Sequence, residues 1–214
     1  IPDIVVSDVM MPIMNGITMC KMLKEDVRTS HIPIILLTAK DSLQDKEEGY
    51  QVGADSYLTK PFSATLLHSR INNLLESRKR LAERLNTNTP HHNMDEKRAL
   101  LADSLNKLDN EFLEKINRLI EDRLSSEKID IGYLADNMCM SKSTLYRKMK
   151  ALTGLSTNEY VRKIKMQYAE RLLLEGRYNV SEIAFRVGIN SVVYFRQCFK
   201  EEFGVLPSDY LKQP

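Results

Sequence analysis

Three side chains that could carry phosphoryl chemistry stand at the ends of three short apolar segments. They are Asp8, Thr38 and Lys60, the last one just past its segment. Because sites in parallel α/β sheets gather at the carboxyl ends of strands, we expect the three to converge at one edge. A carboxylate nucleophile, with a hydroxyl and an ammonium to hold the product oxygens, suits formation of an acyl phosphate. Any one of them alone would more often be a capping or surface residue.

The segments that must position these residues alternate between strand and helix patterns. Continuous β-branched or apolar runs are typical of parallel strands that are buried on both faces. The predicted strands cover residues 3–8, 33–38 and 55–59, and the predicted helices cover 16–27, 43–52 and a stretch after Pro61. This order predicts an α/β fold, with a right-handed parallel sheet layered by helices.

Four motifs in this half appear in the order found in the receiver domain of response regulators, which the sequence therefore resembles. They are Asp8-Val-Met-Met-Pro12 with Asn15-Gly16, Leu37-Thr38-Ala39-Lys40, Gly53-Ala54-Asp55 with Tyr57, and Lys60-Pro61-Phe62. The resemblance implies a partial flavodoxin-like fold with Asp8 as the phosphoacceptor. It also implies that Thr38 and Tyr57 form a switch pair and that Lys60 contacts the phosphoryl group. The Lys60-Pro61 bond matches the family's usual cis-peptide site.

The resemblance begins at the third strand of the family pattern. Roughly 45 to 50 residues of that pattern, including its acidic metal-binding pair, would precede Ile1. A Mg²⁺ ion would then be held by Asp8 and the main-chain carbonyl of Met10, with its other ligands missing from this chain. We therefore expect a truncated receiver over residues 1–84, with weak or absent Mg²⁺ binding and poor phosphorylation of the chain alone. The parent could be a free response regulator or a hybrid sensor kinase.

The second half nearly repeats itself at an interval of 50 residues. The first copy contains Ser141, Leu145, Met149, Lys150, Gly154 and Tyr160, and the second contains Ser191, Phe195, Phe199, Lys200, Gly204 and Tyr210. Upstream residues recur at an offset of 49, as with Ala135 and Ala184. A period of this length indicates one supersecondary unit built twice. Each unit has the pattern of a helix, a tight turn and a second helix, and is predicted to read DNA.

The outer face of each second helix holds the candidate DNA contacts. They are Lys142, Ser143, Tyr146 and Arg147 in the first unit, and Ser191, Val192, Arg196 and Gln197 in the second. Arginine and glutamine can read guanine and adenine edges, and valine can contact a thymine methyl group. Residues 140–165 carry seven basic side chains and one acidic one. For Lys148, Lys163, Lys165 and Lys200, contacts to phosphates and simple solvation are equal alternatives.

The last 105 or so residues resemble the AraC-type DNA-binding domain. The matching residues are Ile183-Ala184, Gly188, Tyr194-Phe195, Phe199-Lys200, Gly204 and Pro207-Ser208 with Tyr210. We expect this domain over residues 111–214, after a linker over 85–110. By the resemblance, a rigid helix over 157–175 joins the two units and sets their reading helices in successive major grooves, about 34 Å apart. Gln197 departs from the family pattern, which often has a basic residue there.

Composition excludes several other classes. The three cysteines are far apart and have no CxxC pair, which argues against a disulfide framework or a zinc site and favours a reducing cytoplasm. No apolar run is long enough for a bilayer, so no membrane contact is expected. A phosphatase of the haloacid-dehalogenase type would need a second aspartate where Met10 stands.

These observations predict a non-enzymatic transcription factor of a two-component system, controlled by phosphorylation of an aspartate. The predicted partners are double-stranded DNA, an upstream histidine kinase, RNA polymerase and a second copy of the chain in a homodimer. The alternative is a DNA-binding module whose receiver remnant serves only as a dimerisation scaffold. DNA affinity that depends on phosphorylation separates the two.

Overall fold

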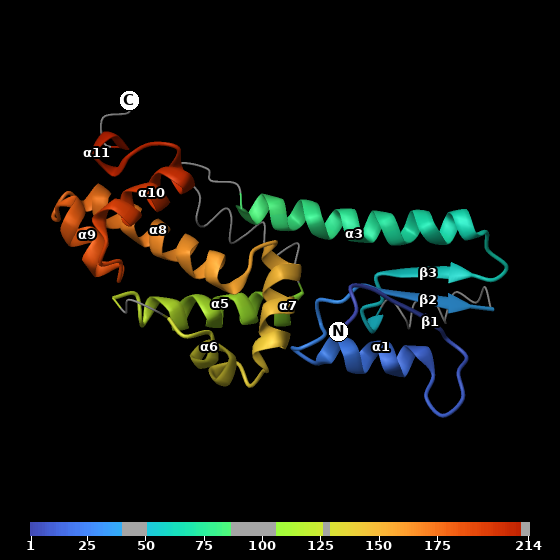
Figure 1. The fold of residues 1–214 in the computed structure, drawn as a ribbon. Coiled ribbons are helices and arrows are strands. Elements are labelled where there is room, and N and C mark those ends of the chain that lie inside the picture. Colours follow the sequence, from blue (N-terminus) through green and yellow to red (C-terminus); the bar gives the residue numbers. More distant parts are fainter. Residues whose placement is uncertain (40–50, 87–105, 126–128, 211–214) are drawn as a thin grey trace. The chain divides into compact units, whose positions relative to one another are not determined.

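The computed structural model describes residues 1–39, 51–86, 106–125 and 129–210 (Figure 1). These residues form two compact units. The first contains residues 1–39, 51–86, 106–112 and 147–154, and the second contains the other described residues. The linker expected over residues 85–110 lies mostly outside the described residues.

A three-stranded parallel sheet organises the first unit. Its strands β1 (Val5–Asp8), β2 (Ile34–Thr38) and β3 (Ser56–Thr59) lie in that order. Helix α1 (Gly16–Glu25) runs along one face of the sheet, and α3 (Ala64–Asn86) runs along the other (Figure 1). The predicted α/β arrangement is confirmed, and each strand starts within two residues of its expected position. The helix expected over 43–52 falls almost entirely outside the described residues.

The core of this unit lies between the sheet and α1. Ile34, Leu36 and Tyr57 of the sheet pack there against Cys20 of α1. Asp55 closes one end of this core, because its carboxylate accepts from the Lys24 Nζ at 2.6 Å and from the Ile34 backbone amide at 2.9 Å. The same carboxylate lies 3.6 Å from the Arg78 guanidinium of α3. One side chain therefore connects both helical layers to the sheet.

The second half is entirely helical in its described part. Its helices are α5 (Lys107–Glu121), α6 (Ile131–Asn137), α7 (Lys142–Thr153), α8 (Thr157–Glu175), α9 (Val180–Arg186), α10 (Val192–Phe203) and α11 (Pro207–Tyr210). Each of α6 and α9 has 7 residues, and each of α7 and α10 has 12. The two predicted helix-turn-helix units are confirmed. No helix in the described ranges has the length and hydropathy that a membrane span needs.

Helix α8 contributes to both helix-turn-helix units. It starts with a capping box between Ser156 and Glu159, and it ends at Gly176, whose φ of 67° is left-handed. At its start, the Tyr160 hydroxyl donates to the Asn117 side chain of α5 at 2.9 Å. Fifty residues later, the Tyr210 hydroxyl of α11 bonds to Glu170 of α8. Thus α5 holds the end of the first helix-turn-helix unit in place, and α8 holds the end of the second helix-turn-helix unit.

The core of the second helix-turn-helix unit is apolar and well filled. Its buried residues are Met166, Ala169, Leu172, Leu173, Ile183, Ala184, Val187, Phe195, Cys198 and Phe199. The Phe199 ring lies 4.5 Å from the Phe203 ring and 5.4 Å from the Tyr210 ring, measured between centroids. Aromatic pairs at these distances add to the stability that apolar burial already provides. The unit therefore offers a firm support for α10.

Candidate phosphoacceptor site and nucleic-acid interface

The carboxyl edge of the sheet brings Asp8, Thr38 and Lys60 together. The Lys60 Nζ lies 2.5 Å from the Asp8 Oδ2, and the Lys60 backbone amide donates to the Thr38 carbonyl at 2.7 Å. The Lys60–Pro61 peptide bond is cis, as the resemblance implied. Asp8 and Lys60 are both partly open to solvent, with side-chain exposures of 36% and 41%. A carboxylate that solvent can reach, held beside an ammonium, is a suitable acceptor for a phosphoryl group.

Gly16 sits against the backbone of the acceptor residue. A Cβ at this position would lie 2.2 Å from the Asp8 carbonyl oxygen, closer than any real contact. The Gly16 amide donates to the Val9 carbonyl at 2.9 Å, and the Asn15 side chain caps α1 by accepting from the Thr18 amide at 2.7 Å. The Asn15-Gly16 pair therefore starts α1 directly behind Asp8 and fixes the backbone of the acceptor.

The expected switch residues, Thr38 and Tyr57, are both buried, with 3% and 8% exposure. Tyr57 pairs in register with Leu36 and packs with it in the core beneath α1. Thr38 lies two residues after Leu36, so its side chain leaves the sheet on the same face. The two side chains thus share one face of neighbouring strands, and their role as a switch stays a prediction.

The residues that the structure describes do not complete a Mg²⁺ site. Asp8 supplies one carboxylate, which is already paired with Lys60, and Met10 supplies one main-chain carbonyl. In the described ranges, no three His, Cys, Asp or Glu side chains are grouped for metal binding. Mg²⁺ demands near-ideal octahedral oxygen coordination, commonly with one or two carboxylates. The expected ligands Asp8 and Met10 therefore fall short of a site by themselves.

The exposed faces of α7 and α10 match at six of their first eight positions. In both helices the second, fifth and sixth positions are exposed, and the fourth, seventh and eighth are buried. Seven of the eight predicted DNA contacts are exposed, and Val192 is partly exposed. Ser141 caps α7, since its hydroxyl accepts from the Thr144 amide at 3.1 Å, and Ser191 caps α10 by accepting from the Tyr194 amide at 3.3 Å. Two equivalent helix ends are thus presented to solvent.

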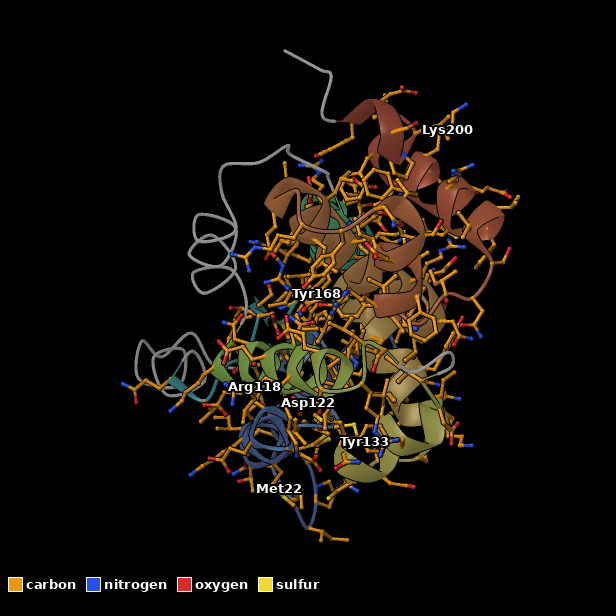
Figure 2. All side chains as sticks on the ribbon, turned by 90° about the vertical axis from the view of Figure 1, so that its left-hand side faces the viewer. Met22, Arg118, Asp122, Tyr133, Tyr168 and Lys200 are labelled. Carbon is orange, nitrogen blue, oxygen red and sulfur yellow. The ribbon has the colours of Figure 1, made fainter. Side chains whose placement is uncertain are left out.

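Lys148, Lys163 and Lys165 are buried. The prediction that they either contact phosphates or are simply solvated was therefore wrong. Lys148 is ion-paired with Asp109 of α5. The Lys163 Nζ lies 3.8 Å from the Glu202 carboxylate, and the Lys165 Nζ donates to the Gly188 carbonyl at 3.4 Å. Only Lys200 of the four is exposed, and it lies on the outer side of α10 (Figure 2). A buried charge is costly without a partner, and each of these buried lysines has one on another segment of the chain. The pairs therefore tie those segments together.

Two exposed residues of α10 were missed by the sequence reasoning. Val193 is 77% exposed and Tyr194 is 50% exposed, although both are large and apolar. The 50-residue offset places Val193 opposite Ser143, which was a predicted contact, so the repeat itself contained the signal. The Tyr194 hydroxyl is hydrogen-bonded to Arg162 of α8. Tyr194 is thereby oriented by the helix that joins the two units.

Comparison with known protein families matches two separate stretches of the chain. Residues 1–72 match the family model of the response regulator receiver domain, and residues 134–213 match that of a helix-turn-helix domain. Histidine kinase P4 of Formosa agariphila is 37% identical over 210 residues, which are 98% of this chain and 15% of that protein. Heme response regulator HssR of Staphylococcus saprophyticus is 50% identical over 74 residues, 35% of this chain and 32% of that protein. The chain therefore spans a third or less of either relative.

Among solved structures, the chain is similar to the C-terminal domain of AraT, a response regulator from Geobacillus stearothermophilus. The two are 30% identical, with a TM-score of 0.43, over 47% of this chain and 84% of that one.

Proposed function

We propose that this chain, which joins a response regulator receiver domain to an AraC-type helix-turn-helix domain, is a sequence-specific DNA-binding transcriptional regulator controlled by phosphorylation of Asp8. The observation that carries the proposal is the pair of matching exposed faces on α7 and α10. Two equivalent reading helices on one chain suit a two-part site on double-stranded DNA.

Base recognition by α7 rests on its first two turns. Arg147 is exposed there and can donate two hydrogen bonds to a guanine, while Lys142 and Ser143 lie nearer the helix start. Tyr146 is half-exposed beside them. Reading helices present their N-terminal residues to base edges, which are the residues that α7 exposes. On α10 the corresponding residues are Val192, Arg196 and Gln197, with Ser191 at the cap.

Control by phosphorylation rests on the ion pair between Asp8 and Lys60. Conversion of the carboxylate to an acyl phosphate adds negative charge beside the Lys60 ammonium, which can then hold a phosphoryl oxygen. Thr38, at the end of the neighbouring strand, would then contact the phosphoryl group through its hydroxyl. A shift of these side chains would bias a population between two states of the receiver. The scaffold alternative is less favoured, because it gives the pair of Asp8 and Lys60 no role.

Partners follow from the two domains. The receiver implies an upstream histidine kinase, and the helix-turn-helix domain implies duplex DNA in the cytoplasm. A second copy of the chain and RNA polymerase are further proposed partners. Mg²⁺ would assist phosphorylation of Asp8. The Asp8 carboxylate and the Met10 main-chain carbonyl would bind it, together with ligands beyond these two residues.

Substitution of Arg147 by alanine tests the DNA-reading assignment. We expect binding to a selected site to weaken by about 1–3 kcal/mol and base preference to relax at one position, because a bidentate contact is lost. Lys200→Ala is the control: it removes an exposed cation of α10 that lies past the predicted base contacts, so it should weaken binding to all sequences alike. The measurement is fluorescence anisotropy with selected and scrambled duplexes. Unchanged affinity of Arg147→Ala for the selected site would show that α7 does not read bases.

A further inference from the structure

The two reading helices differ in the chemistry of their first turn. Helix α7 begins with Lys142 and Ser143, and the equivalent positions of α10 hold Val192 and Val193. Val193 is 77% exposed, among the most exposed of the large apolar side chains in the described ranges. Val193 is solvent-exposed, and Val192 is partly exposed with its other side packed against the core of the unit. Neither valine side chain has a hydrogen bond to offer a base edge. The start of α10 therefore presents methyl groups where α7 presents an ammonium and a hydroxyl.

Two polar neighbours on α10, Gln197 and Tyr194, are engaged within the protein. The Gln197 amide donates to the Glu201 carboxylate at 3.0 Å, one turn further along the helix. The Tyr194 hydroxyl is hydrogen-bonded to Arg162 of α8. Glutamine can read adenine only by redirecting its amide, so Gln197 would have to give up its bond to Glu201. The exposed Val193 side chain has no such bond to give up, and the exposed part of Val192 lies beside it.

Duplex DNA has one apolar group in the major groove, the 5-methyl group of thymine. Charge on the same helix favours DNA over an apolar protein partner, since Arg196 and Lys200 are both exposed and can approach phosphates. Contact between valine and thymine methyl groups would remove apolar surface of both from water.

We infer that α10 recognises its half of the DNA site through thymine methyl groups touched by Val192 and Val193, whereas α7 uses hydrogen bonds and charge. The inference rests on the proposed DNA-binding function and adds the chemistry of the second half-site. Thymine within the α10 half-site is thus the specific ligand. The two halves of one operator are read by different physical means.

Deoxyuridine, which lacks only the methyl group of thymidine, tests the inference. Duplexes obtained by binding selection would be remade with deoxyuridine in one half-site at a time. We expect each replaced thymine contacted by α10 to weaken binding about threefold to tenfold, since a buried methyl group contributes roughly one such step. The same replacement in the α7 half-site should change binding less than twofold.

Two matched variants test whether the residue at the second position of each helix causes the sensitivity to deoxyuridine. Val193→Ser should lose the sensitivity to deoxyuridine in the α10 half-site, and Ser143→Val should create it in the α7 half-site. Failure of the wild-type chain to select any sequence would refute the proposed function itself. If the chain selects a site, but deoxyuridine weakens binding equally in both half-sites, the proposed DNA-binding function is supported. Recognition of thymine methyl groups by α10 is then refuted. A Val193→Ser variant that changes from dimer to monomer in sedimentation, with deoxyuridine sensitivity intact, would assign the valines to a protein interface instead.

Discussion

At the residue scale, burial separates structural charges from functional ones. Lys163 and Lys165 are buried and contact Glu202 and the Gly188 carbonyl, so they brace the helices around α8. Arg147 and Lys200 are exposed and available to a ligand. Removal of either buried lysine should therefore act through stability, whereas removal of an exposed cation should act through DNA affinity.

His31 is a buried titratable residue whose charge the fold does not accommodate. Burial, together with the nearby ammonium of Lys148, lowers the pKa of His31 to about 4. Its Nδ1 has no hydrogen-bond partner among the residues that the structure describes. An unfolded chain binds this proton near pH 6.5, so the contribution of His31 to stability is present above that pH and is lost as pH falls toward 4.

We expect the free energy of unfolding to fall by about 2 kcal/mol from this residue between pH 7 and pH 5. His31→Leu should remove that part of the pH dependence, as measured by urea unfolding at both values. The control is His68→Asn, which changes an exposed histidine of α3 and should keep the full acid sensitivity. An unchanged pH slope in His31→Leu would show that His31 already carries a proton in the folded state.

At the element scale, the two helix-turn-helix units share one turn built from different residues. Cys139 in the first turn has a φ of 54°, and Gly188 in the second has a φ of 64°. Both turns are closed by the same backbone bond, from Met140 to Ala135 and from Ile189 to Ala184, each at 2.9 Å. A left-handed backbone is costly for any residue except glycine. The first unit therefore carries a strain that the second avoids.

Cys139→Gly should raise the free energy of unfolding by about 0.5–1 kcal/mol, because the relief of strain exceeds the added entropy of the unfolded chain. Gly188→Cys, the reciprocal change, should lower it by at least as much. Chemical denaturation followed by circular dichroism measures both. Equal effects of the same sign in the two variants would contradict the equivalence of the turns.

Elements with strong periodicity could be predicted from the sequence alone, and α8 begins and ends at the expected residues. The starting residue of each strand was predicted to within two residues, because continuous apolar runs are typical of buried parallel strands. The burial of Lys163 could not be predicted, because its partner Glu202 stands on another helix, 39 residues away. Val193 was missed for a different reason: its apolar side chain favours burial, although the 50-residue offset aligns it with the predicted contact Ser143.

At the scale of the whole molecule, we expect α8, which joins the two helix-turn-helix units, to set the separation of the two proposed reading helices. It is an unbroken helix of 19 residues, about 28 Å long. Its ends are fixed by the capping box at Ser156 and by the left-handed Gly176. A connector of this length and stiffness suits two reading helices in successive major grooves, about 34 Å apart. The spacing of the two half-sites should therefore be a fixed property of the protein.

Insertion of five base pairs between the half-sites rotates one by about half a turn of the duplex, out of reach of its helix. We expect affinity to fall to that of a duplex carrying the α7 half-site alone, while insertion of a full turn should not restore it, because α8 cannot stretch. Gly176→Ala, which strains the end of α8 without touching its DNA-facing neighbours, is the matched variant and should weaken binding only to the two-part site. Equal affinity for all spacings would mean that α7 and α10 bind independently, and the rigid-connector account would fail.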